Sequence, residues 1–367
     1  MINTKKCDFT YWWGEPSIAA FLQQPISFES PMQSLLDPAI LFFVFGVFAG
    51  AVKSNLEIPP QISRFLALYL LMALGLKGGF ALAHSGLTSD VARSLGCAIA
   101  MAIVVPAISY RVLKRWVSGF DAAAVAATYG SVSAVTFITA VQYLDTHNLA
   151  YGGHMAAAMA LMESPAIIMA VLFANALRKQ PSAVVTSGAA VRGNDSLSAA
   201  PGRTSLKNVL HESFTDGAQL LLLGAMAVGL ITGDAGKAVM QPFTGDLFKG
   251  MLSFFLLDMG LMAARNLPEL RGKSPWMVAY AVVAPISHAA LALLLCFLLG
   301  VPAGDAGLLM VLAASASYIA VPAVLRYAIP EANPSLYFGL SLGVTFPINI
   351  LVGIPVYITV AQRVLGS

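Results

Sequence analysis

Apolar and polar positions fall into long blocks along this chain, and the apolar blocks predict its architecture. Each apolar block runs for about 20 residues, the length of helix that spans the hydrocarbon core of a bilayer. Short polar segments separate the blocks, and helices satisfy their own backbone groups in lipid. The pattern predicts an all-α integral membrane protein with ten transmembrane helices, at 37–53, 62–83, 93–113, 121–144, 154–177, 217–233, 246–264, 275–299, 305–327 and 335–361.

The two halves of the chain resemble each other. Residues 71–76 (LMALGL) recur as residues 256–261 (LLDMGL) at an offset of 185, and residues 130–134 (GSVSA) recur as 314–318 (ASASY) at an offset of 184. Short strings of Leu, Ala and Gly also match by chance, but two nearly equal offsets favour a repeat. Five spans per repeat is an odd number, so the second repeat is inverted in the membrane relative to the first.

Composition and charge support this picture and orient it. The chain is 58% hydrophobic and only 11% charged, with a mean hydropathy of +0.77. Lys and Arg concentrate in cytoplasmic loops of membrane proteins. With the N-terminus outside, fourteen basic residues fall in inside loops and six in outside segments. We therefore expect both termini outside a bacterial inner membrane, and a net charge of +3 gives no indication of nucleic-acid binding.

The repeats divide the chain into four parts. Residues 37–177 and 213–367 are the predicted five-helix repeats. Residues 178–212 are rich in Ser, Ala and Gly, which predicts a flexible cytoplasmic linker; it is either a plain tether or a docking surface for a soluble regulator. Residues 1–36 carry aromatic and Pro residues and are expected to lie at the membrane interface or to be disordered.

Two spans contain residues that disfavour a continuous helix. The fourth carries Gly130, Ser131, Val132 and Ser133, and the ninth carries Ser315, Ala316 and Ser317 followed by Pro322. Gly, Pro and closely spaced Ser free backbone groups from the helical ladder. In lipid this is tolerated only beside protein or a wet cavity. We expect broken helices 4 and 9 to meet at mid-membrane and to bind a small anion, although close helix packing by small residues is the alternative.

Polar and ionisable side chains inside the spans predict a cation site. Carboxylates and carbonyls freed by proline are oxygen ligands that suit Na⁺, which we place near Glu163 and Ser317. The predicted cation-binding residues are Thr136, Glu163, Asp258, Tyr318 and Asn349. Lys77 and Asp258 occupy repeat-related helices, so we expect a buried structural pair between them, a coupling role for one of them, or a solvated position near the membrane interface for either.

Five short motifs follow one another along the chain: LEIP at 56–59, GLKGG at 75–79, GSVS at 130–133, ESPA at 163–166 and ANPS at 332–335. Together they resemble the sodium-dependent bicarbonate transporters, over the chain after residue 36. The resemblance implies a homotrimer in membrane lipid whose core domain moves against a gate domain. It also implies Na⁺-coupled import of bicarbonate, no enzymatic activity, no cofactor besides Na⁺ as coupling ion, and control by a small PII-like cytoplasmic protein.

One position departs from the pattern of that family. Members carry an Asp after the serines of the ninth span, and this chain has Tyr318 there. If that Asp neutralises the coupling cation, Na⁺ coupling is in question. The alternatives are therefore a permease for another small anion, a proton-coupled carrier, and a membrane sensor that has lost transport.

Overall fold

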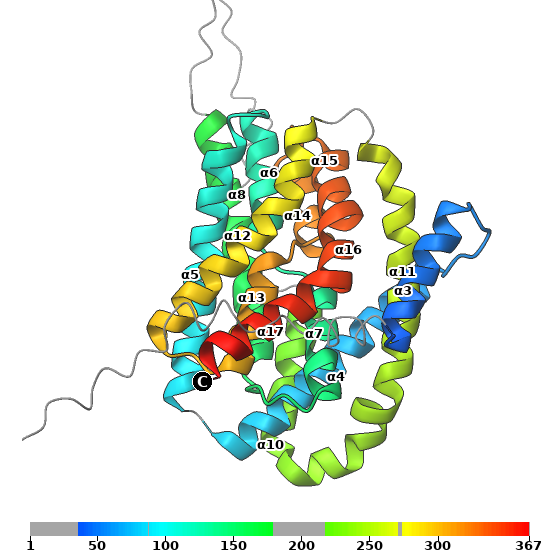
Figure 1. Ribbon diagram of the computed structural model, residues 1–367, viewed down its shortest axis with the longest axis vertical. Helices are drawn as coiled ribbons and strands as arrows, with labels where there is room; N and C mark the ends of the chain where they lie inside the picture. The colour runs from blue at the N-terminus through cyan, green and yellow to red at the C-terminus, as the bar shows by residue number, and fades with distance from the viewer. Residues whose placement is uncertain (1–35, 87, 179–216, 271–273, 367) are drawn as a thin grey trace, which may run out of the picture.

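The computed structural model describes residues 36–86, 88–178, 217–270 and 274–366, and these residues form helices joined by short connections (Figure 1). The predicted N-terminal segment and linker fall almost entirely outside the described residues. The helices are α3 (Pro38–Ala51), α4 (Pro60–Ser85), α5 (Ser89–Leu113), α6 (Gly119–Gly130), α7 (Ala134–Thr146), α8 (Met155–Arg178), α10 (Gly217–Gln241), η1 (Pro242–Asp246), α11 (Leu247–Asn266), η2 (Leu267–Leu270), α12 (Pro275–Leu299), α13 (Ala303–Ala314), α14 (Ala320–Ala328), α15 (Pro334–Leu340), η3 (Ser341–Thr345), α16 (Phe346–Ile348), η4 (Asn349–Gly353) and α17 (Ile354–Leu365).

Seven helical stretches of the described chain are long and apolar enough to cross a membrane. One of them, residues 217–266, is 50 residues long because α10 runs through η1 into α11 without a loop. The chain turns back within this stretch at Gly233, whose φ of 53° lies in the left-handed region. A side chain at this position strains the backbone, so glycine permits the turn. The described part of the chain is thus all-helical and has the long apolar helices of a multi-pass membrane protein.

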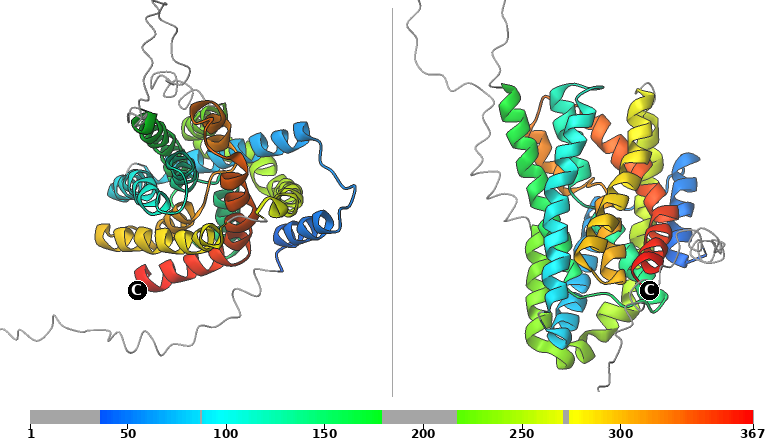
Figure 2. Two further views of the ribbon diagram at one scale, coloured as in Figure 1. Left: turned by 90° about the horizontal axis from the view of Figure 1, so that it is seen from above. Right: turned by 60° about the vertical axis from the view of Figure 1, so that its left-hand side comes forward.

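The helices form two groups. In the first, which we call the peripheral group, α4 packs along α10 and α3 packs along α11. In the second, the central group, α5 packs on α6 and α8, α13 packs on α7, α12 and α17, and α14 packs on α6 and α8. Contacts between the groups are fewer. Seen from above, α3 lies at one edge of the molecule, and α5 and α8 lie on the side away from it (Figure 2).

Small residues bring the peripheral helices into close contact. A Cβ atom on Gly79 of α4 would lie 2.8 Å from the backbone nitrogen of Leu230 in α10, and one on Gly229 would lie 2.6 Å from the carbonyl oxygen of Leu76. Glycine at such positions lets two helix backbones approach, as is common for helix pairs in lipid. The GLKGG motif at 75–79 therefore has a packing role, through Gly75 and Gly79.

Candidate functional site

Two interruptions of helical structure meet inside the central group, and we call this region the crossing. Residues 131–133 separate α6 from α7, and residues 315–319 separate α13 from α14. The Ser133 N–H donates to Ser315 Oγ at 2.9 Å, and the Ser317 N–H donates to the Thr128 carbonyl at 2.8 Å. The two predicted interruptions therefore contact each other directly, across about 180 residues of sequence.

The serine hydroxyls at the crossing differ in whether their proton is already used in a hydrogen bond within the protein. Ser315 Oγ donates to the Leu312 carbonyl at 2.8 Å while accepting from Ser133, so its proton is committed. Ser133 Oγ accepts from the Thr136 N–H at 3.2 Å and caps α7. Ser317 Oγ accepts from the Val321 N–H at 3.3 Å. A hydroxyl that only accepts keeps its proton for a ligand, so Ser317 remains a donor and Ser315 is a structural link, whereas the Ser133 hydroxyl also lies near the Tyr318 hydroxyl.

Several buried polar atoms at the crossing have no partner. Seven side-chain atoms among the described residues are buried without a hydrogen bond, and four of them are Ser131 Oγ, Thr136 Oγ1, Tyr318 Oη and Asn349 Oδ1. The four side chains are 1–4% exposed. An unsatisfied buried polar group costs about 1–3 kcal/mol. A concentration of such groups at one place is the pattern expected of a binding site that is completed by its ligand.

Four helix ends also converge at the crossing. α7 and α14 begin there and α6 and α13 end there. The beginning of a helix carries a partial positive charge and the end a partial negative charge. The crossing thus offers hydroxyls and positive helix ends to an anion, and carbonyl-bearing helix ends to a cation, without a charged side chain in either interruption.

The last apolar stretch holds the crossing from one side. Asn349 Nδ2 donates to the Ala314 carbonyl at the end of α13, at 2.8 Å. Tyr129 shares a hydrogen bond of 2.7 Å with Thr345 Oγ1, which also donates to the Ala281 carbonyl. Both Thr345 and Asn349 lie in π-helical turns, η3 and η4, which are frequent at functional sites. Asn349 is among the residues predicted from the sequence; Thr345 and these turns are not, although Gly343, Pro347 and Gly353 disfavour a regular α-helix there.

The predicted cation residues fall into two sets. Thr136, Tyr318 and Asn349 lie at the crossing, where Tyr318 packs edge-on against Phe346 with ring centroids 5.1 Å apart. Glu163 accepts a hydrogen bond of 2.8 Å from Gln219 of α10 and so faces the peripheral group. Asp258 of α11 accepts a hydrogen bond from Ser63 of α4 and so also faces the peripheral group.

The expected pairing of Lys77 with Asp258 is wrong. Lys77 Nζ lies 3.0 Å from Asp145 Oδ2 instead, and Asp258 binds Ser63. Ser63 and Lys77 are on the same helix, and their 14-residue separation corresponds to about 21 Å along its axis. Asp258 therefore cannot reach both. Asp145 and Asp258 each have a partner on α4, but the two partners, Lys77 and Ser63, lie at different positions along that helix.

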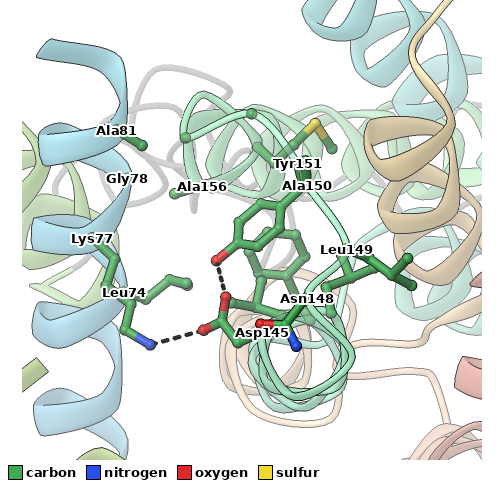
Figure 3. A pocket seen from close by; sticks show the side chains of 16 residues that line it. Leu74, Lys77, Gly78, Ala81, Asp145, Asn148, Leu149, Ala150, Tyr151 and Ala156 are labelled. Atoms are coloured by element: carbon green, nitrogen blue, oxygen red, sulfur yellow. Dashed lines mark hydrogen bonds and ion pairs between the residues drawn. The ribbon is translucent and has the colours of Figure 1, made fainter. Parts of the chain in front are cut away.

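A pocket of about 410 Å³ lies at the junction of the two groups, between α4, α7 and the connection from α7 to α8 (Figure 3). Lys77 and Asp145 form their ion pair at its wall. The Tyr151 hydroxyl donates to Asp145 Oδ1 at 3.0 Å. Burial and the Asp145 charge raise the pKa of Tyr151, so Tyr151 keeps the proton that it donates. The sequence analysis misses Asp145 and Tyr151, because neither lies inside an apolar block.

A second buried polar cluster ties α5 and α13 to the start of α8. Asp305 Oδ2 accepts from Ser94 Oγ at 3.0 Å, and Asp305 Oδ1 accepts from the Gly152 N–H at 2.6 Å. His154 Nε2 lies 3.0 Å from Asp305 Oδ2, outside the geometry of a hydrogen bond. Asp305 is 2% exposed. The described residues contain no group of three or more His, Cys, Asp or Glu side chains suited to a metal ion.

The comparison with known proteins agrees with this geometry. No curated protein matches the chain at a significant level. A protein family does match it, over residues 38–362, and is described as the Na⁺-dependent bicarbonate transporter superfamily. The match includes every helix of both groups except the last three residues of α17. The chain therefore belongs to the Na⁺-dependent bicarbonate transporter superfamily.

Proposed function

We propose that this protein imports bicarbonate by Na⁺ symport and that the anion binds at the crossing. The observation that carries the proposal is the unpartnered Ser131 hydroxyl, buried at the crossing, where the Ser317 hydroxyl also has a proton to donate. Bicarbonate has three oxygens that accept hydrogen bonds. Bonds from hydroxyls to an anion are stronger than those between neutral groups, and the positive ends of α7 and α14 add to them.

The oxygen atoms of the crossing that are not assigned to the anion suit the coupling cation, Na⁺. Na⁺ is a hard cation that takes oxygen ligands, and Thr136 Oγ1 and Asn349 Oδ1 are buried oxygens without a partner. Asp258 of α11 is the candidate for the negative charge that the family pattern places at position 318. We infer that Na⁺ binds near Ser317 with these oxygens, and that Glu163 acts from the junction with the peripheral group, through Gln219.

The fold supports a transport cycle in which one group moves against the other. Both interruptions of the crossing lie in the central group, whereas α3, α4, α10 and α11 pack chiefly on one another. We propose ten spans in two inverted five-helix repeats, with the halves of spans 4 and 9 meeting mid-membrane. The central group then carries both ions as an elevator-like core, and the peripheral group is the gate.

The remaining parts of the proposal come from the family resemblance and from charge. The basic residues of the connections favour a cytoplasmic position for residues 114–118 and 267–274, with both termini outside a bacterial inner membrane. The resemblance favours a homotrimer and a PII-like regulator on the cytoplasmic side. Large apolar side chains that face outward on α10 and α12 suit lipid or subunit contacts, among them Leu220, Ile231, Val239, Val283, Leu294 and Leu298.

Tyr318 favours a second candidate, transport of the anion without Na⁺. A phenol at this position removes the carboxylate that the family pattern places there. If no other side chain supplies the negative charge of that carboxylate, the protein is a proton-coupled carrier or a sensor that binds the anion without transporting it.

Uptake of labelled bicarbonate into proteoliposomes separates these functions. With an inward Na⁺ gradient we expect uptake that stops when K⁺ replaces Na⁺. Equal uptake in both cations removes symport, and a dependence on a pH gradient instead of Na⁺ establishes a proton-coupled carrier. Absence of uptake in every condition contradicts the proposed function. Competition by unlabelled small anions then identifies the preferred substrate.

A further inference from the structure

The pocket between α4 and α7 lies apart from the crossing but close to it. Phe137 lines the pocket, and its backbone N–H donates to the Ser133 carbonyl at the crossing, at 3.1 Å. The pocket extends from there along Val141 and Leu144 to the connection between α7 and α8. An anion that moves along this side of α7 therefore reaches the crossing within one helical turn of Phe137.

The pocket contains one cation and one carboxylate among its lining residues, and they neutralise each other. Lys77 and Asp145 are only partly buried, with side chains 23% and 34% exposed. Lys77 Nζ also lies 4.3 Å from the centre of the Phe248 ring, so the ammonium keeps an attractive contact when its carboxylate partner changes. Figure 3 shows Lys77 pointing from α4 toward Asp145, with the Tyr151 hydroxyl on the other carboxylate oxygen.

The ion pair spans the two helix groups. Lys77 belongs to the peripheral group and Asp145 to the central group. Beside it the two groups meet backbone to backbone, since a Cβ on Gly78 would lie 2.7 Å from the Gly153 carbonyl oxygen. The Lys77–Asp145 ion pair must therefore form or break whenever the two groups move relative to each other. Because the pair is partly exposed, it contributes little to stability. A small anion is a credible competitor for Lys77.

We propose that this pocket is a second anion site, at which Lys77 exchanges Asp145 for a small oxyanion on its way to the crossing. The identity of the oxyanion as bicarbonate rests on the proposed function. In this role Lys77 attracts the anion and Asp145 competes with it. The two residues then have opposite effects on anion affinity, which a purely structural ion pair does not produce.

Uptake kinetics of three variants test this opposition. We expect Lys77→Gln to raise the KM for bicarbonate about 10-fold, because a charge-assisted bond is lost. Asp145→Asn frees Lys77 and lowers the KM by about 2- to 5-fold, within the range of an exposed ion pair. Lys77→Arg keeps the charge and most of the affinity. Lys114→Gln, at an exposed connection on the other side of the molecule, is the matched control. Equal impairment in Lys77→Gln and Asp145→Asn, or no change in either, overturns the proposal.

Chemical labelling provides a readout that does not depend on transport. A water-soluble amine reagent modifies Lys77 in the purified protein, and mass spectrometry gives the rate in chloride, nitrate, sulfate and bicarbonate at equal ionic strength. We expect an oxyanion to slow labelling several-fold relative to chloride, and more strongly in Asp145→Asn. Protection by bicarbonate together with uptake supports both proposals. Protection by an oxyanion without bicarbonate uptake keeps the second site and rejects the proposed function. Equal rates in all four anions reject the second site.

Discussion

The two interruptions of the crossing each carry a Ser-x-Ser pattern, one in each half of the chain, yet their serines are bonded differently. Ser133 and Ser317, the second serine of each Ser-x-Ser, both accept from a backbone N–H of the following helix. The first serines differ, because Ser131 Oγ has no partner whereas Ser315 Oγ donates to Leu312 and accepts from Ser133. One half thus supplies a free donor and the other supplies the link between the halves.

This difference shows that two similar sequence patterns need not have equal roles. A ligand site where two helix interruptions meet needs groups that bind the ligand and groups that hold the interruptions together. A serine cannot donate its single proton to both. The variants below test this division of roles, and they run from the largest expected effect to the smallest.

Ser131→Ala has the largest expected effect, and it acts on binding. Loss of a hydrogen bond to an anion costs about 1.5–3 kcal/mol, which corresponds to a rise of roughly 10- to 150-fold in the KM for bicarbonate. The free energy of unfolding stays constant or rises slightly, because the deleted hydroxyl has no partner in the protein. Uptake kinetics and thermal unfolding of the same preparation measure the two quantities. An unchanged KM places the anion elsewhere.

Ser315→Ala is expected to act on stability instead. It leaves the buried Ser133 N–H without its acceptor, and such a group costs about 1–3 kcal/mol. Thermal unfolding in detergent measures the loss, with Ser131→Ala as the matched control at the equivalent position. If both alanine variants unfold alike, Ser315 is not the link between the halves.

Ser133→Ala and Ser317→Ala test the two equivalent serines against each other. Each substitution removes a side-chain acceptor at the start of a helix, worth about 1 kcal/mol for Ser133, which is the N-cap of α7. We expect a smaller loss for Ser317, because its bond to Val321 is 3.3 Å long. Both variants also raise the KM. A variant that unfolds normally and transports normally shows that its serine does not contact the anion.

The smallest effect is expected far from the crossing, at a contact between the same two halves. Arg178 at the end of α8 binds Glu331 at 2.7 Å, and this hydrogen bond lowers the pKa of Glu331 below its ordinary value of 4.5. The contribution of the pair to stability is therefore complete above about pH 4.5 and is lost as the pH falls through the lowered pKa. Because Glu331 is partly exposed, the contribution is below about 1 kcal/mol.

Unfolding temperatures of the wild type and Arg178→Gln at pH 7 and pH 4 measure this contribution. The difference between the two proteins should shrink at the lower pH. A difference that grows with acidity contradicts the assigned direction of the pKa shift.

Much of the helical framework follows from hydropathy and from local chemistry. The predicted span 275–299 has the limits of α12, and the predicted end of the sixth span at residue 233 is the glycine at which α10 turns. The interruptions at 131–133 and 315–319 fall where Gly and Ser weaken a helix. These features depend on neighbours in sequence, and they are therefore visible without a structure.

The bonding of individual side chains does not follow from the sequence. Lys77 pairs with Asp145 and not with Asp258 because of where α7 crosses α4, which no local pattern encodes. The same holds for Asp305, whose partners Ser94, Gly152 and His154 lie more than 150 positions away. Local patterns identify the serines of the crossing, and packing determines which of their protons remain available.

The short connection between α4 and α5 limits how the molecule can move. It joins the peripheral group to the central group, and only residues 86–88 separate Ser85 from Ser89. Four virtual bonds of a fully extended chain span about 14 Å, so the two helix ends stay within that distance throughout a cycle. A relative translation of the two groups at this corner is therefore limited to about twice this distance, and any larger travel elsewhere requires the groups to rotate relative to each other.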